Sequence, residues 1–259
     1  MPAELQASRR DATLILTLSN PGAKNALHPD LCAAAIEVLS TAERDDSVRA
    51  VVLTGADGYF CAGSSFNQLL DNRAKDRAIE AEFIDNLQGW IEAIQDCPKP
   101  VIAAVEGGAA GAGFSLALAC DMIVASASAK FAMPNVSVAL APEGGAAWLL
   151  SRALPRQLMA EALFTGEALV ATRLHELGVV NRIVAEGMAL DAALDWSDRL
   201  AAQAPNVMEQ IKTLTSRSFH QTLDQHFSEE KLAFIESLYH ANGYEGIRAF
   251  FEQRKPLYK

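Results

Sequence analysis

Two short apolar segments in the first half of the chain each lead into a run of residues rich in glycine. Residues 50–54 (AVVLT) precede a glycine-rich stretch at 55–63, and residues 101–105 (VIAAV) precede a second one at 106–113. Apolar runs of this length predict buried strands. Glycines between a strand and a helix allow backbone N–H groups to converge on one negative oxygen. Close packing of a helix on a strand also explains either loop alone, but two such loops favour a binding site.

The remaining pattern predicts an α/β chain of about 185 residues followed by helices. Further strands are expected at three apolar segments, residues 13–19, 122–125 and 179–184. Helical spacing of apolar residues predicts helices at 28–42, 78–95, 144–154, 156–163 and 168–177, and a helix of small residues that ends at 119. From about residue 188 to 253 every segment has helical spacing. Aromatic residues in this helical tail need a surface that buries them, either the core of the chain or a neighbouring subunit: Phe219, Phe227, Phe234, Tyr239, Tyr244, Phe250 and Phe251.

Charge and composition exclude several classes of protein. The chain has 259 residues and a formal net charge of −10 at pH 7, so it lacks the basic footprint of a nucleic-acid-binding protein. No apolar run reaches the roughly 20 residues that cross a bilayer, and the first ten residues are too polar for a secretory signal. We therefore expect a cytoplasmic protein without a membrane or nucleic-acid partner. The cysteines form no metal-binding motif, so we expect neither a metal site nor a disulfide framework: Cys32, Cys61, Cys97 and Cys120.

Two familiar glycine-loop architectures do not fit this sequence. A dinucleotide fold has the pattern G-x-G-x-x-G and an acidic residue after the next strand. Gly108, Gly111 and Gly113 have the order G-x-x-G-x-G instead, and the next strand ends in ASAS without an acid. A hydrolase nucleophile lies in G-x-S-x-G, whereas Ser115 lies in GFSLA.

Five segments resemble one known family in both order and spacing. They are residues 20–27 (NPGAKNAL), 55–63 (GADGYFCAG), 98–107 (PKPVIAAVEG), 111–121 (GAGFSLALACD) and 249–254 (AFFEQR). Together they are similar to the crotonase, or enoyl-CoA hydratase/isomerase, family. The resemblance extends from about residue 10 to the carboxy terminus. It implies an α/β fold with a spiral of ββα units at 1–190 and an all-helical region at 191–259, which forms homotrimers or dimers of trimers.

The resemblance also implies a substrate class and a set of site residues. The family binds acyl-CoA thioesters and holds an enolate between two backbone N–H groups, which here belong to Ser64 and Ala112. The positions that line the site are Lys24, Ala26, Ala62, Gly63, Ser64, Ser65, Phe66, Ala112, Ser115 and Asn135. Lys24 suits the phosphates of coenzyme A, although a solvated surface lysine is the alternative. The family usually has aspartate at the position of Ser65. Coenzyme A is part of the substrate, so no separate cofactor is expected.

The acidic residues of the site point to one reaction within the family. Its hydratases use two glutamates, and the matching positions here hold Ser115 and Asn135, which cannot act as carboxylate bases. Residues 141–146 (APEGGA) resemble the Pro-Glu-Gly segment of the isomerases that convert 3-enoyl-CoA to 2-enoyl-CoA with one glutamate as base. Glu143 is therefore the predicted catalytic base, assisted by the N–H groups of Ser64 and Ala112.

Other functions and another role for Glu143 stay open. Glu143 precedes a predicted helix, where the helix dipole alone favours a carboxylate. Apolar neighbours are expected to bury Glu143 and raise its pKa: Val136, Val138, Leu140 and Trp148. The alternative functions are an enoyl-CoA hydratase, a ring- or oxepin-CoA enzyme of aromatic catabolism, and a non-catalytic acyl-CoA-binding subunit.

Overall fold

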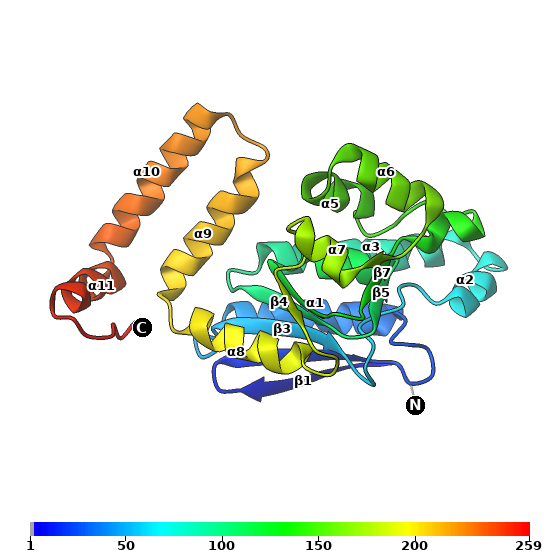
Figure 1. Cartoon of the computed structure of the whole chain (residues 1–259), viewed down its shortest axis with the longest axis horizontal. Helices are drawn as coiled ribbons and strands as arrows, with labels where there is room; N and C mark the ends of the chain where they lie inside the picture. Colours follow the sequence, from blue (N-terminus) through cyan, green and yellow to red (C-terminus); the bar gives the residue numbers. More distant parts are fainter. Residues whose placement is uncertain (1–2) are drawn as a thin grey trace.

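Two β-sheets and the helices around them form the body of the protein (Figure 1). The computed structural model describes residues 3–259. Within these residues the larger sheet has six strands, in the order β1 (Glu4–Arg10), β2 (Thr13–Ser19), β3 (Ala50–Gly55), β4 (Val101–Val105), β6 (Met122–Ser126) and β9 (Arg182–Val184). The smaller sheet has three, in the order β5 (Gly108–Ala110), β7 (Lys130–Ala132) and β8 (Leu169–Val170).

Helices fill the connections and make up the end of the chain. In the body they are α1 (Pro29–Glu43), α2 (Phe66–Arg73), α3 (Arg77–Asp96), α4 (Ala112–Ala119), the 3-10 helix η1 (Pro134–Val138), α5 (Ala146–Ala153), α6 (Arg156–Thr165) and α7 (Ala171–Glu176). The last four are α8 (Ala189–Ala201), α9 (Pro205–Ser218), α10 (Leu223–Tyr239) and α11 (Ala241–Phe251).

The chain passes repeatedly from one sheet to the other, which gives the fold its spiral character. Strand β4 is followed by β5 of the smaller sheet, and β6 is followed in the same way by β7. The strands from β2 to β9 of the larger sheet pair in parallel. Because parallel strands end at the same edge of a sheet, the glycine loops after β3 and β4 are neighbours there. A bridge between Cys61 and Ala109 joins the two loops directly.

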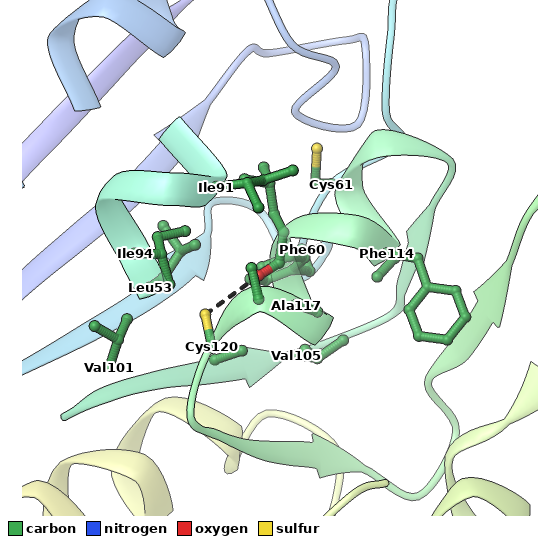
Figure 2. Close-up of a cluster of buried hydrophobic side chains, with 14 of the residues drawn as sticks. Leu53, Phe60, Cys61, Ile91, Ile94, Val101, Val105, Phe114, Ala117 and Cys120 are labelled. Carbon is green, nitrogen blue, oxygen red and sulfur yellow. Dashed lines mark hydrogen bonds between the residues drawn. The ribbon is translucent and has the colours of Figure 1, made fainter. Parts of the chain in front are cut away.

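Alternate residues of the parallel strands pack into two apolar clusters, one on each face of the larger sheet. Val51 and Leu53 of β3 belong to the large cluster that includes residues of α1 and α3, whereas Val52 packs with Ala193 and Leu194 of α8. This period of two is that of a strand buried on both faces. Figure 2 shows the large cluster where the first glycine loop meets α3 and α4, through Phe60, Cys61, Ile91, Ile94, Phe114 and Ala117.

All four cysteines are buried free thiols. Burial raises the pKa of Cys32 and of Cys61 to about 12, so both thiols stay protonated at neutral pH. The Cys61 thiol donates to the carbonyl oxygen of Asn25 at 3.2 Å, which links the first glycine loop to the segment after β2. The cysteines are therefore parts of the core and its turns.

The largest difference from the expected elements is β1. It pairs antiparallel with β2 from Glu4 opposite Ser19 to Arg10 opposite Thr13. Its side chains are mostly exposed, and Leu5 and Ala7 are the two apolar residues in it, which is too weak a pattern to have predicted a strand. Strands β5, β7 and β8 have only two or three residues each, which is too short for a periodic pattern. The strand expected at 179–184 is confined to β9, and the helix expected at 168–177 is confined to α7.

The helical tail begins on the larger sheet and then leaves it. Helix α8 packs against β3 and β4, whereas α9 and α10 extend away from the two sheets in Figure 1. The seven aromatic residues expected to need a covering surface are all exposed in this single chain. The division into residues 1–190 and 191–259 and the trimer stay predictions. Within residues 3–259, no helix is both long and apolar enough to cross a membrane.

Candidate active site

Two backbone N–H groups without an acceptor lie where the glycine loops meet. Gly63 has a φ of +83°, and a Cβ there would lie 2.5 Å from the carbonyl oxygen of Ala110 and 3.1 Å from the backbone nitrogen of Ala112. The loops therefore approach so closely that only glycine fits between them. Within residues 3–259, neither the N–H of Ser64 nor that of Ala112 donates a hydrogen bond. Two free donors beside each other suit one negative oxygen, and the position of Ala112 at the start of α4 adds the favourable end of the helix dipole.

The carboxylate of Glu143 lies beside this pair of donors. The hydroxyl of Ser64 donates to Glu143 Oε1 at 2.7 Å. A Cβ placed on Gly111, the residue before Ala112, would lie 4.0 Å from the same carboxylate oxygen. The structure therefore brings together the three residues predicted to be catalytic, although they come from three separate segments of the chain.

Glu143 does not cap the helix that follows it. Gly144 and Gly145 separate it from Ala146, where α5 begins, and both have left-handed φ values of +62° and +68°. The N-cap residue Gly145 has no side chain, and the carboxylate of Glu143 is turned to Ser64. The interpretation of Glu143 as a carboxylate kept only by the helix dipole is therefore not supported by the contacts.

Ser115 and Asn135 both bind the loop that carries Glu143. The fully buried hydroxyl of Ser115 donates to the backbone carbonyl of Glu143 at 3.0 Å. The side-chain amide of Asn135 donates to the carbonyl of Ala141 at 3.2 Å, and its own backbone carbonyl accepts from the N–H of Leu140 at 3.0 Å. At the two positions where the resemblance places hydratase carboxylates, this chain thus has groups that position the Glu143 loop.

The amide oxygen of Asn135 also faces the site. This Oδ1 atom is buried and has no hydrogen-bond partner among the described residues. A Cβ on Gly111 would lie 3.8 Å from it, so it shares the surroundings of the Glu143 carboxylate. A free acceptor beside the base is available to a substrate or to a protonated carboxyl group.

Burial raises the pKa of Glu143 above its ordinary value. The hydrogen bond from Ser64 acts in the opposite direction, and the negative charge of Glu80 raises the pKa further. The four apolar side chains expected to enclose Glu143 are themselves 42% to 46% exposed: Val136, Val138, Leu140 and Trp148. The contacts that the structure gives the carboxylate are the Ser64 hydroxyl and the turn at Gly111.

The residues expected on the coenzyme A side form one strip along the first glycine loop. The N–H of Ala62 donates to the carbonyl of Lys24 at 2.9 Å, and the N–H of Leu27 donates to that of Gly63 at 2.8 Å. This pairing places Lys24 and Ala26 alongside the free N–H of Ser64. The ammonium group of Lys24 lies 5.2 Å from the centre of the Tyr59 ring, a favourable cation–π contact.

Ser65 and Phe66 begin α2 beside this strip. Ser65 is the N-cap residue, and its hydroxyl accepts from the N–H of Gln68 at 3.4 Å. Serine and aspartate are both good N-cap residues, so the departure from the family at Ser65 preserves this local role. Phe66 is 56% exposed at the first position of the helix, available to a ligand on the surface.

Asn25 is a residue of the site that no expectation singled out. It is buried, has a left-handed φ of +56°, and its amide donates to the carbonyls of Ala56 at 2.9 Å and Tyr59 at 2.6 Å. Its Oδ1 accepts from the N–H of Asn20 at 3.0 Å. Asn25 thereby fixes the first glycine loop against the end of β2. The sequence signal that could have indicated this role is the place of Asn25 within the family segment 20–27, directly before Ala26 and Leu27.

We expect Asn25→Ala to lower the free energy of unfolding by about 3 kcal/mol, because it removes the side-chain donor of the Tyr59 carbonyl, one of the two donors of the Ala56 carbonyl, and the acceptor of the Asn20 N–H. Alanine is also less suited than asparagine to the left-handed backbone at this position. Urea unfolding measures the change. The exposed Asn67 in the first turn of α2 gives a control, whose alanine variant stays within about 0.5 kcal/mol of the parent. Equal stability of the two variants would contradict the role of Asn25.

A spiral fold with two free backbone donors beside a buried carboxylate is the arrangement that the resemblance to acyl-thioester enzymes implies. The family model described as "Enoyl-CoA hydratase/isomerase" matches residues 9–259. The chain belongs to the enoyl-CoA hydratase/isomerase family, as its sequence motifs predict.

Relatives and solved structures agree with this assignment. The chain is 31% identical over 257 residues to the 2,3-dehydroadipyl-CoA hydratase of Escherichia coli (strain K12), covering 99% of each chain. It is 34% identical over 248 residues to the 1,2-epoxyphenylacetyl-CoA isomerase of the same organism, covering 95% of this chain and 94% of the relative. The crystal structure of an enoyl-CoA hydratase from Polaromonas sp. JS666 matches with a TM-score of 0.97 and 47% identity, over 99% of this chain and 100% of the other. These matches confirm the crotonase fold.

Proposed function

We propose that the protein moves the double bond of an enoyl-CoA from position 3 to position 2. The Glu143 carboxylate removes a proton from the α-carbon of a 3-enoyl thioester. The resulting dienolate oxygen accepts hydrogen bonds from the N–H groups of Ser64 and Ala112. The same carboxyl group then returns the proton at the γ-carbon, which gives the conjugated 2-enoyl thioester. Apart from the coenzyme A of the substrate, this reaction needs no cofactor.

One observation supports this proposal above the others: the 2.7 Å hydrogen bond from Ser64 to Glu143. It places a carboxylate next to the residue whose N–H would hold the enolate oxygen. A base that removes an α-proton has to lie close to the thioester carbonyl, because the two groups act on adjacent carbons. The raised pKa of Glu143 also suits a group that takes up and returns a proton near neutral pH.

Ser115 and Asn135 support the use of a single base. Their hydrogen bonds to the Glu143 loop hold this base in place, and neither side chain can replace a second carboxylate. A proton shift within one substrate requires one group that acts first as base and then as acid. Hydration requires in addition a water molecule delivered to the β-carbon.

The test uses a 3-enoyl-CoA and the 2-enoyl-CoA of the same chain length in separate cuvettes. For an isomerase, the ultraviolet absorbance of the conjugated thioester grows in the first cuvette and is stable in the second. Loss of the conjugated signal in the second cuvette would show hydration. Saturable binding of both esters without any change in absorbance would show a non-catalytic acyl-CoA-binding protein.

Hydration is the second candidate function because of the relatives and neighbours reported above. The 2,3-dehydroadipyl-CoA hydratase and the Polaromonas protein both carry the name of a hydratase. In this chain the water would be held by Asn135, whose buried Oδ1 is free to accept a hydrogen bond, and activated by Glu143. The two-cuvette comparison separates this function from the isomerase.

We expect Ser64→Ala to move the acidic limb of the pH profile of kcat/KM to higher pH. The base acts in its deprotonated form, and the Ser64 hydroxyl lowers the pKa of Glu143. Removing the hydroxyl therefore raises that pKa, while the backbone N–H of residue 64 stays in place. The profile is measured with a 3-enoyl-CoA, and the variant of the exposed Ser151, Ser151→Ala, is the control. A limb that stays in place or moves to lower pH would contradict the assignment of Glu143 as base.

We also propose that α9, α10 and α11 form the contacts of a homotrimer or a dimer of trimers. The exposed aromatic side chains of these helices, among them Phe227, Phe234 and Tyr239, form an apolar surface that this chain does not cover. Light scattering coupled to size-exclusion chromatography measures the mass in solution. A monomer at micromolar concentration would contradict the proposal.

A further inference from the structure

A stack of four side chains joins helix α5 to the end of α9, and the two helices can be followed in Figure 1. The guanidinium carbon of Arg152 lies 3.5 Å from the centre of the Trp148 ring and 5.9 Å from the centre of the Phe219 ring. The ring of His220 is stacked on the same tryptophan, with 5.8 Å between the ring centres and an angle of 15° between the planes. Trp148 and Arg152 are one turn apart in α5, whereas Phe219 and His220 directly follow α9. We call these four residues the α5–tail stack.

The first turn of α5 is hydrogen-bonded to the loop of Glu143. The N–H of Ala146 donates to the carbonyl of Glu143 at 3.3 Å, and the N–H of Leu149 donates to that of Gly145 at 2.9 Å. Trp148 lies in this same turn. A shift of the turn therefore moves the backbone of Glu143 with it.

The stack lies on the side of α5 that faces away from the core. Ala146, Leu149 and Leu150 of this helix are buried in the large apolar cluster. Trp148 is 42% exposed, and Arg152 is exposed as well. Within residues 3–259 Arg152 forms no ion pair, so its planar cation is available to aromatic faces. Loss of the stack would leave this side of α5 without support from the tail.

The tail has a second attachment to the body near the stack. The ammonium group of Lys212 in α9 donates to the carboxylate of Asp121 and to the carbonyl of Ile94, both at 2.8 Å. This lysine, together with Trp148 and Phe219, lines a cavity of about 470 Å³ between α9 and the body. Beside the stack α5 and α9 are thus not closely packed, and the contact between them depends on the stacked side chains. The end of α9 is anchored by Lys212 and can therefore support α5 through the stack.

We propose that Trp148 and Arg152 are positioning residues for the Glu143 base, and that the tail supports the active site through them. The stack holds the first turn of α5, and this turn holds the carboxylate of Glu143 against the hydroxyl of Ser64. The inference rests on the proposed role of Glu143 as base, but the support of its loop by the stack is measurable without a substrate.

The main test compares Trp148→Ala and Phe219→Ala with the parent in steady-state kinetics on a 3-enoyl-CoA. We expect kcat to fall by about tenfold in Trp148→Ala, because a slightly displaced base transfers a proton less well. KM stays within about twofold, since the N–H groups of residues 64 and 112 stay in place. Phe219→Ala changes the tail alone and lowers kcat by about threefold or more. Trp148→Phe keeps an aromatic face for Arg152 and recovers kcat to within about threefold of the parent.

The pH profile of kcat/KM separates a displaced base from general damage. The Ser64 hydroxyl lowers the pKa of Glu143, so weakening this contact raises that pKa and moves the acidic limb to higher pH. We expect this shift in Trp148→Ala and in Phe219→Ala. The negative charge of Glu80, which also raises this pKa, lies on α3 and is unchanged in both variants. In a Ser64→Ala background, Trp148→Ala causes no further shift, because the contact is already absent.

Three further variants serve as controls. Arg182→Gln removes a similar contact elsewhere, in which the guanidinium carbon lies 3.8 Å from the centre of the Trp196 ring of α8, and it keeps the kcat and the pH profile of the parent. His220→Phe keeps a ring against Trp148 but cannot titrate, so the acidic limb stays in place. Arg152→Gln weakens the stack at an exposed position and gives the answer if Trp148→Ala does not fold.

Hydrogen exchange of the substrate-free protein measures the support of the loop directly. We expect the amides of residues 141–150 to exchange about tenfold faster in Trp148→Ala and in Phe219→Ala than in the parent. In Arg182→Gln their exchange is unchanged. If Glu143→Gln retained turnover, the proposed function would fall, and the exchange rates would still decide whether the stack holds this loop.

Four results would overturn the inference. The first is a kcat, an acidic limb and an exchange rate that keep the parent's values in both Trp148→Ala and Phe219→Ala. The second is a lower kcat without a shift of the limb, which would show general damage. The third is a shift in the Ser64→Ala background as large as in the parent, which would show that the stack does not act through the contact of Ser64 with Glu143. The fourth is a limb that moves in His220→Phe, which would assign the limb to the histidine.

Discussion

We expect Glu143→Gln to lower kcat for a 3-enoyl-CoA by about 10³–10⁴-fold, which is the upper range of what a single acid–base group contributes. Glutamine has nearly the same shape, and its side-chain oxygen can still accept the 2.7 Å hydrogen bond from Ser64. It cannot take up the α-proton. The proposed binding of the substrate through the N–H groups of Ser64 and Ala112 is left intact, so affinity is expected to change less than about threefold. Steady-state kinetics and titration with a saturated acyl-CoA measure the two quantities separately.

The control for this variant is Glu161→Gln, an exposed glutamate of α6 that leaves the kinetics unchanged. Turnover of Glu143→Gln within tenfold of the parent would exclude Glu143 as the base. An equal loss of turnover and of affinity would show that the substitution displaces the loop, which Ser115 holds at the carbonyl of Glu143 and Asn135 holds at the carbonyl of Ala141.

The second large effect is expected at Gly63. The Cβ of Gly63→Ala would lie 2.5 Å from the carbonyl oxygen of Ala110 and 3.1 Å from the nitrogen of Ala112. The two glycine loops have to separate to admit it, and the free N–H groups of Ser64 and Ala112 then no longer meet at one oxygen. Loss of one such donor costs about 10²–10³-fold in kcat.

Gly58 offers a matched control in the same loop. Its φ is +71°, close to the +83° of Gly63, but no atom lies within 4 Å of a Cβ placed on it. Gly58→Ala therefore carries the strain of a left-handed alanine without a steric clash. Its activity stays within a few fold of the parent while its stability falls. Equal losses of activity in both variants would show that strain, and not the separation of the loops, is responsible.

The sequence predicts the scaffold of this site better than its internal contacts. Apolar strands followed by glycines indicate that the two loops lie at one edge of a parallel sheet, and the structure has them there. The resemblance to the family points to Glu143, which lies beside Ser64. The contacts of Ser115 and Asn135 could not be predicted, because a one-letter code does not show whether a buried hydroxyl or amide faces the ligand or the backbone. The same holds for Asn25, whose partners come from segments with no shared periodicity.

The hydrogen bonds of Ser115 and Asn135 have a consequence for how this active site could change over evolutionary time. Each side chain restrains the loop of Glu143, and a Cβ on Gly144 would lie 3.0 Å from the Cβ of Ser115, so there is no spare space at this contact. A longer side chain at position 115 would therefore lose the hydrogen bond to the Glu143 carbonyl and press on Gly144. If Glu143 is the base, as we propose, a glutamate gained at position 115 has to be accompanied by a change in the Glu143 loop, so the two arrangements of carboxylates are not exchanged one residue at a time.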